Sequence, residues 1–243
     1  MIGPHGSPGK LISNKTGFPV MIPPSVLAIV IRALQEAWAV ICADPAKHLA
    51  PVTPGNPEED RYTDALCEVL HYWLRASANP VQGFTSDVFE NVERGANLSN
   101  FDQSVINKQP DLVIRLANGP LVNARRYVGI FVETKVVSMK RSLGSYTKDG
   151  VSRFVRGDYA WAMQDGLMIA YRTKPHRKLD TLESPLGKDR ALLVAPENKK
   201  NLVQSGLTIP ASGKSTHDRN WTYRAGGQPG SIRVWHLWSL DVP

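Results

Sequence analysis

The chain has 243 residues, 42% of them hydrophobic, so it is long enough to bury a sizeable core in one large domain. Its formal net charge of +7 fits a polyanionic partner and is also compatible with an ordinary soluble protein. Two cysteines without metal-ligand spacing exclude a zinc knuckle and a disulfide framework, and they fit a reducing, cytoplasmic location. The most apolar early run, residues 26–31, is too short for a membrane span, so no membrane partner is expected.

The first helix is expected over residues 25–43, after a Gly- and Pro-rich arm over residues 1–24. Its apolar residues recur at helical spacing, as they do in a helix packed on a core. A proline-rich connection follows over residues 44–57. The expected organisation is an arm and helix, residues 1–56, packed on a domain over 57–243 whose C-terminal extension starts at about residue 180.

A second helix is predicted to begin at Pro57, with Asn56 as its N-cap and two glutamates in its first turn. At about 100° per residue, Glu59 falls closer than Glu58 to the centre of the apolar stripe of this helix. Glu59 is therefore expected to lean toward the core. A capping box, in which Glu59 reaches back to the backbone of Asn56, is equally compatible with the sequence.

Three strands are expected next, over residues 84–94, 110–114 and 129–135. The last two are rich in β-branched residues and flank the turn-forming Asn118-Gly119-Pro120, so we expect them to pair as a hairpin. Side chains alternate between the faces of a strand, which places Glu133 and Lys135 together and Thr134 on the opposite face. Because Asp111 begins the partner strand, two acids and a lysine are expected to converge at one end of the hairpin.

A helix over residues 152–165 and a buried strand over 167–171 are expected to follow, with further strands over 191–195 and 232–240. Gly157 within this helix indicates a close backbone approach or a helix that begins later. Residues 215–219, Ser-Thr-His-Asp-Arg, are expected to form a polar loop, because no Gly-x-Ser-x-Gly elbow accompanies them. His236 alternates with apolar residues and is interpreted as a hydrogen-bonded core histidine.

Pro110-Asp111, followed after about twenty residues by Glu133-Thr134-Lys135, resembles the signature of the PD-(D/E)xK nuclease superfamily. The order helix, strand, strand, strand, helix, strand over residues 58–172 is similar to the core order of that superfamily. The resemblance implies an α/β, restriction-endonuclease-like core, a mixed central sheet flanked by helices, with an N-terminal helical arm and a C-terminal β extension. In the structural alternative, Glu133 and Lys135 are solvent-facing neighbours on an edge strand and Asp111 is a turn residue.

The resemblance implies that Asp111 and Glu133 bind a divalent metal and that Lys135 positions or activates the attacking water. Glu59, on the first core helix, resembles a glutamate that completes the metal site in many members, and the Thr134 carbonyl is a further candidate ligand. Oxygen ligands without His or Cys favour magnesium or manganese over zinc. The implied activity is that of a metal-dependent endonuclease that hydrolyses phosphodiester bonds of DNA.

Basic residues cluster after this unit, and six are expected to contact nucleic acid: Arg153, Arg156, Arg172, Lys174, Arg177 and Lys178. Cations beside an acidic metal site offset its repulsion of a phosphate backbone. DNA is the expected partner, RNA stays open, and a homodimer is compatible with the sequence. The superfamily often carries a glutamine on the helix after Glu-x-Lys, for which Gln164 is the candidate here. Two alternatives stay open, a catalytically inactive nucleic-acid-binding protein and a partner-binding protein on the same fold.

Overall fold

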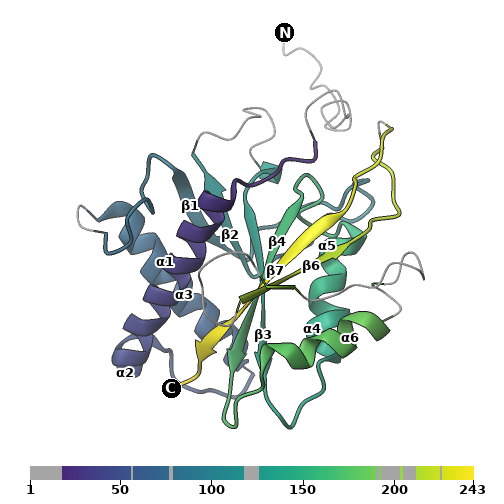
Figure 1. Cartoon of the computed structure of the whole chain (residues 1–243). Helices are drawn as coiled ribbons and strands as arrows, with labels where there is room; N and C mark the ends of the chain where they lie inside the picture. Colours follow the sequence, from purple (N-terminus) through teal and green to yellow (C-terminus); the bar gives the residue numbers. More distant parts are fainter. Residues whose placement is uncertain are drawn as a thin grey trace.

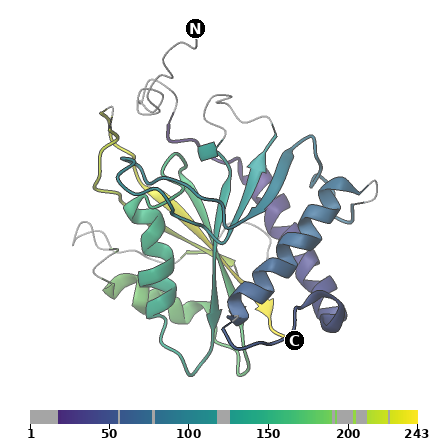
Figure 2. The ribbon, with the colours of Figure 1, turned by 180° about the vertical axis from the view of Figure 1, so that it is seen from behind.

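The computed structural model describes residues 18–55, 57–76, 79–117, 126–189, 192, 203–204, 212–224 and 226–243. Its centre is a seven-stranded mixed sheet in the order β1-β2-β3-β4-β7-β6-β5, with helices on both faces (Figures 1 and 2). The strands are β1 (Phe89–Arg94), β2 (Leu112–Leu116), β3 (Ile130–Val137), β4 (Asp165–Arg172), β5 (Val203–Gln204), β6 (Ser212–His217) and β7 (Ile232–Asp241). The predicted α/β class, a mixed sheet flanked by helices, is confirmed.

Two groups of helices cover the sheet, one on each side in Figure 1. The first group is α1 (Pro24–Ala43), α2 (Pro45–His48) and α3 (Glu58–Arg75). The second consists of α4 (Gly144–Tyr146), the π-helical turn η4 (Thr147–Val151), α5 (Ser152–Arg156), the 3-10 turn η5 (Leu179–Leu182) and α6 (Glu183–Lys188). Buried apolar side chains from both groups and from the strands form one continuous core.

The core elements follow the predicted order, from α3 through β1, β2, β3 and the α4–α5 segment to β4. β2 and β3 pair antiparallel, with Leu112 opposite Val132 and Ile114 opposite Ile130, which confirms the hairpin. Its expected turn at Asn118 falls in a part of the chain that the structure does not describe. β4 then pairs parallel to β3, and β7 lies between β4 and β6, so the C-terminal residues extend the sheet as predicted.

α1 belongs to the same core. It has 20 residues and is apolar enough to cross a membrane by length and composition, which corrects the prediction that the early apolar run is too short. Leu27, Val30 and Leu34 are buried, and Trp38 Nε1 donates to the Asp241 carbonyl at 2.8 Å, at the end of β7. Packing on the sheet therefore accounts for the apolar face of this helix.

The helix expected over residues 152–165 is wrong at both ends. The helical segment begins eight residues earlier, at Gly144, and α5 ends at Arg156. Gly157 has φ +72°, a left-handed conformation that suits glycine at a helix end, and a Cβ there would lie 2.8 Å from the Trp221 ring. Asp165 already belongs to β4, so the chain needs residues 157–164 to turn back to the sheet.

Three other predictions of local structure need comment. The strand expected from residue 84 begins only at Phe89. The polar loop expected over residues 215–219 is wrong for Ser215 to His217, which belong to β6 and pair with β7, and right for Asp218 and Arg219, which lie outside the strands. Of the strand expected over residues 191–195, only Leu192 is described, and it lies in a turn.

Arg219 holds the segment before β7 against the sheet. The residue is 5% exposed, and its guanidinium donates to the carbonyls of Gly230 at 3.0 Å, Met163 at 3.1 Å and Pro229 at 2.5 Å. It also lies over the Trp221 ring, 5.2 Å from the ring centroid. Burial lowers the pKa of Arg219 to about 10, so the side chain stays charged at neutral pH. Carbonyl dipoles and an aromatic face solvate this cation in place of water.

Candidate active site

The charged residues of the Pro-Asp and Glu-x-Lys pattern meet in the structure. Lys135 Nζ lies 2.8 Å from Glu133 Oε1, so both side chains share one face of β3. Asp111, immediately before β2, accepts hydrogen bonds through Oδ2 from the Thr134 backbone N at 2.7 Å and from Thr134 Oγ1 at 2.8 Å. β3 lies inside the sheet, Glu133 is 0% exposed and Lys135 is 12% exposed. The alternative of solvent-facing neighbours on an edge strand is therefore wrong.

The Glu133 carboxylate accepts hydrogen bonds from three side chains. Oε1 accepts hydrogen bonds from Lys135 Nζ and from Arg153 Nη1, the latter at 2.9 Å. Oε2 accepts one from the Tyr159 hydroxyl. Burial raises the pKa of Glu133, and repulsion from Asp111 raises it further, while Lys135 and Arg153 act in the opposite direction. Two cations and a hydroxyl donor all favour the ionised carboxylate, so the site holds a buried negative charge within a fixed cage of donors.

Lys135 is the centre of this group. Its Nζ donates to Glu133 Oε1 at 2.8 Å, to Glu59 Oε1 at 2.9 Å and to the Thr134 carbonyl at 2.6 Å. Burial alone would lower the pKa of Lys135, but attraction to Glu133, Glu59 and Asp111 outweighs burial and raises it. The side chain is therefore an ammonium at neutral pH, suited to stabilising negative charge and unable to accept a proton.

Glu59 enters the site from the first turn of α3. Oε1 faces Lys135, and Oε2 accepts from the Val136 backbone N at 3.3 Å. Both oxygens therefore contact β3 and its lysine, whereas Asn56, the other partner of the capping box, is not among the residues described. Burial raises the pKa of Glu59, and Lys135 partly offsets that rise. The lean toward the core expected from helical spacing is confirmed.

Three residues that sequence reasoning missed support the acids. Arg94, at the end of β1, donates to the Asp111 carbonyl at 2.9 Å and pairs with Asp60 and Asp64 of α3. Thr63 Oγ1 lies 3.1 Å from Thr134 Oγ1, and the Tyr159 hydroxyl donates a hydrogen bond to the Glu133 carboxylate. The pairing of β1 with β2 is the feature that would have pointed to Arg94, because Arg94 lies opposite Leu112, the neighbour of Asp111.

The donor set fits a hard divalent cation. Carboxylate and carbonyl oxygens already surround one positive atom, Lys135 Nζ, and no sulfur or imidazole ligand takes part. In the described part of the chain no three Asp, Glu, His or Cys side chains gather closely enough to enclose a metal by themselves. Magnesium is usually bound through one or two carboxylates and keeps several waters, so the carboxylates of Asp111 and Glu133 match it in kind.

Three surface hollows adjoin these residues. One of about 590 Å³ is lined by Glu59, Lys135 and Arg153; one of about 490 Å³ by Arg153 and Tyr159; and one of about 420 Å³ by Arg94 and Asp111. Shared wall residues connect them: Arg153 belongs to the first two, and Asp60 to the first and third. Lys135 and Asp111 therefore each line a hollow at the surface, whereas Glu133 itself is buried and lines none of the three.

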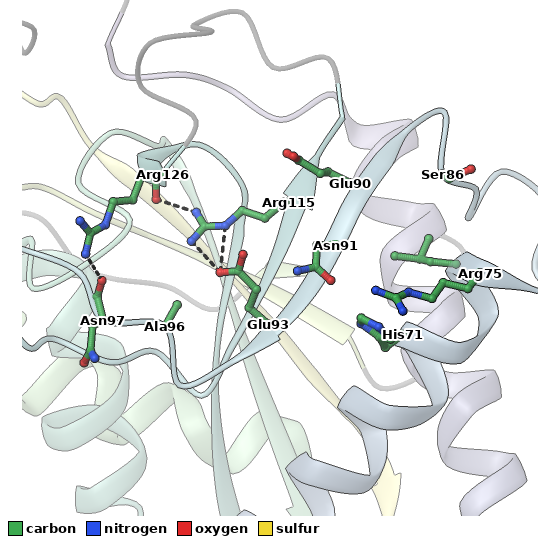
Figure 3. A pocket seen from close by; sticks show the side chains of 11 residues that line it. His71, Arg75, Ser86, Glu90, Asn91, Glu93, Ala96, Asn97, Arg115 and Arg126 are labelled. Carbon is green, nitrogen blue, oxygen red and sulfur yellow. Dashed lines mark hydrogen bonds and ion pairs between the residues drawn. The ribbon is translucent and has the colours of Figure 1, made fainter.

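A larger hollow, of about 700 Å³, lies between the end of α3 and strand β1 (Figure 3). Arg115 and Glu93 face one another there, 2.9 Å apart, and Arg115 also donates to the Arg126 carbonyl. Arg115, the most buried cation of this hollow, is thus neutralised by Glu93. None of the residues expected to form the active site lines the hollow. Size alone does not make it the candidate site.

The six predicted nucleic-acid contacts separate into two groups. Arg153 and Arg156 line the hollows around the site. Arg172 pairs with Asp241 at 2.7 Å and Arg177 donates to backbone carbonyls, and neither lines these hollows. Lys174 and Lys178 do not line them either, so a role for these four residues stays a prediction.

Gln164 does not occupy the helical position expected of it. It lies between the helical segment and β4, where its backbone N donates to the Val20 carbonyl and its carbonyl accepts from Arg233. The expectation of a glutamine on the helix after Glu-x-Lys is therefore wrong, because that helix ends at Arg156. In its place, α5 directs Arg153 to Glu133.

His236 is a buried core histidine, as predicted. Trp238 Nε1 donates to the Tyr146 hydroxyl at 2.9 Å, which leaves the hydroxyl hydrogen for His236 Nδ1 at 3.0 Å. Neutral His236 then carries its hydrogen on Nε2 and donates it to Ser215 Oγ at 2.8 Å, and Ser215 donates to His217 Nε2 at 2.7 Å. In this order the hydrogens of Trp238, Tyr146, His236 and Ser215 each meet an acceptor, and a proton on His236 Nδ1 would break the chain.

Acid is therefore expected to destabilise the fold through His236. Burial, with His217 nearby, lowers the pKa of His236 to about 3. An unfolded histidine titrates near pH ~6.5, so below that pH the unfolded chain gains a proton that the folded chain refuses, which costs about 2 kcal/mol of unfolding free energy at pH ~5. Urea melts of the native protein and of His236→Gln at neutral and mildly acidic pH measure this loss. An equally steep loss in His236→Gln would assign it to other groups.

Glu59→Gln is expected to lower any activity of the site by about 10- to 100-fold. Glutamine keeps one acceptor for Lys135 but removes the negative charge that holds the ammonium. The melting temperature should change little, because Lys135 keeps Glu133 as its counter-charge and the repulsion between Glu59 and Asp111 is relieved. Rates across a magnesium titration, with thermal melts of the metal-free protein, test both statements. Full activity in Glu59→Gln would reduce Glu59 to a structural partner of β3.

The geometry rests on long-range contacts: β3 supplies Glu133 and Lys135, α3 supplies Glu59, α5 supplies Arg153, and Arg94 of β1 donates to the carbonyl of Asp111, just before β2. The sequence pattern connected Asp111, Glu133 and Lys135 in advance, and helical spacing added Glu59. Comparison with family models, with curated proteins and with solved structures returned no match.

Proposed function

We propose that this chain is a divalent-metal-dependent endonuclease acting on DNA, built on the restriction-endonuclease-like fold of the PD-(D/E)xK superfamily. One observation carries the proposal. Glu133 and Lys135 form an ion pair on the buried strand β3, where Glu133 is 0% exposed and held by three donors, and Asp111 accepts two hydrogen bonds from Thr134, the residue between them. The sheet supports it, because an antiparallel β1-β2-β3 unit is followed by a parallel β4 after a helical crossover.

The residues divide the chemistry among them. Asp111 and Glu133 would hold magnesium or manganese, which supplies charge neutralisation and activates water for attack on phosphorus. Lys135, as a fixed ammonium, orients the water or a phosphate oxygen and stabilises the charge that develops on that phosphate. Water delivers its oxygen to phosphorus, the bond from phosphorus to one sugar oxygen breaks, and that sugar oxygen leaves as a hydroxyl with one proton of the water.

A cytoplasmic location goes with this proposal. Cys42 and Cys67 are free thiols in α1 and α3, and burial raises the pKa of Cys67 to about 11. A thiol with such a pKa is inert, so Cys67 acts as a small apolar packing residue.

The direct test is to incubate the purified protein with supercoiled DNA, linear duplex DNA, single-stranded DNA and RNA. We expect cleavage of DNA with magnesium or manganese and none in excess chelator. Glu133→Gln, purified in the same way, controls for contaminating nucleases. Cleavage that survives chelation would contradict the metal site. Binding without cleavage under every metal condition would favour the inactive nucleic-acid-binding alternative.

A further inference from the structure

Arg153 separates the hollow that contains Lys135 from a second hollow of about 490 Å³. The wall of this second hollow is almost entirely polar and includes three cations, Lys108, Arg153 and Arg156. Only two carboxylates, Asp149 and Asp158, line it with them. The lining therefore carries an excess of positive charge directly beside the candidate active site.

Asp158 fixes two of these cations. Its Oδ1 lies 3.4 Å from Lys108 Nζ, and its Oδ2 lies 3.0 Å from Arg156 Nη2. The Asp158 side chain is 12% exposed, whereas those of Lys108 and Arg156 are 33% and 50% exposed. One nearly buried acid thus orients cations from two separate segments, and their outer N–H groups remain available to a ligand in the hollow.

Arg153 and Tyr159 connect the hollow to the reacting groups. Arg153 Nη1 donates to Glu133 at 2.9 Å, and the Tyr159 hydroxyl donates to the other oxygen of the same carboxylate. A guanidinium carries further N–H donors, and the Arg153 side chain is 36% exposed. A ligand oxygen bound in this hollow would therefore lie next to the residue that touches Glu133.

We propose that this hollow is an anion subsite that binds a phosphodiester group of the substrate strand, adjacent to the phosphate being cleaved. The inference rests on the proposed function and adds Lys108, which the sequence did not indicate, as a substrate contact. Guanidinium forks match the paired oxygens of a phosphate, and an ammonium beside them adds a point charge. The subsite fixes the position of the substrate strand relative to Glu133 and makes no contact that depends on base sequence.

The test measures binding without cleavage. A fluorescein-labelled single-stranded DNA, its duplex and an RNA of the same sequence are titrated in excess chelator at several salt concentrations. Lys108→Gln combined with Arg156→Gln is expected to weaken binding about tenfold and to reduce the salt slope by about 1, because the contact to one phosphate is lost. Arg32→Gln combined with Lys188→Gln removes the same charge from exposed positions of α1 and α6 and should leave the slope unchanged.

Two further variants separate binding from folding. Lys108→Arg with Arg156→Lys keeps both charges and should retain the slope. If the charge-removing pair lowers the melting temperature, adding Asp158→Asn removes the acid left without partners, and the reduced slope should persist.

The outcomes distinguish the subsite from the enzymatic proposal. A native protein that cuts DNA with magnesium, together with an unchanged slope in the charge-removing pair, overturns the subsite and leaves the function standing. If the native protein cuts nothing and the charge-removing pair of substitutions reduces the salt slope of binding, the subsite is supported and the proposed function is overturned. Absence of binding to all three nucleic acids overturns both.

Discussion

Lys135→Met is expected to slow phosphodiester cleavage by about 100- to 1,000-fold, which is the effect of removing one preorganised charge from a reaction centre. Methionine keeps the unbranched side chain up to the fourth atom and removes the ammonium that joins Glu59, Glu133 and the Thr134 carbonyl. The metal-free protein should also lose about 3 kcal/mol of unfolding free energy, because breaking a buried ion pair leaves an uncompensated charge. Single-turnover rates and urea melts measure the two effects.

Two further variants make this result specific. Lys140→Met removes an exposed charge soon after β3 and should leave rate and stability near those of the native protein. Glu133 keeps Arg153 and Tyr159 in Lys135→Met, whereas Glu59 loses its ion pair with Lys135. Adding Glu59→Gln removes that acid, so the double variant should regain part of the stability and stay inactive. Near-native cleavage by folded Lys135→Met would end the catalytic assignment of the lysine.

Arg219→Met is expected to cost about 4 kcal/mol of unfolding free energy, the largest change predicted for a residue outside the active site. The substitution removes donors from the buried carbonyls of Gly230, Met163 and Pro229, and water cannot readily replace them. It also removes a cation from the face of Trp221. Arg224→Met, on an exposed part of the same segment, is the matched control. A loss below about 1 kcal/mol would mean that the carbonyls find other donors.

The acid and lysine pair could be predicted because its information is local. Alternation along one strand places Glu133 beside Lys135, and helical spacing turns Glu59 toward the core. Arg94 and Tyr159 could not be found in this way, because their roles depend on which strands are neighbours and on where a helix stops. No sequence period records either fact.

The predictions of helix ends and of polar strand residues were wrong for a related reason. The apolar spacing of residues 152–165 continues past Gly157, whose left-handed backbone and closeness to Trp221 are decided by tertiary packing. Ser215 and His217 read as loop residues because they are polar, yet inside β6 they are buried within a hydrogen-bonded chain that includes His236. Burial of polar side chains depends on partners that lie far away in the sequence.

The place of β7 in the sheet also determines when the molecule can be finished during synthesis. Among the described elements β7 follows all other strands in sequence, yet it lies between β4 and β6, and its end accepts a hydrogen bond from Trp38 of α1. A nascent chain that has not reached residue 232 leaves the edge of β4 unpaired and Trp38 without this acceptor. Every residue of the candidate active site precedes that point. The cluster is thus synthesised before β7, the strand that joins β4 to β6 and completes the described sheet around it.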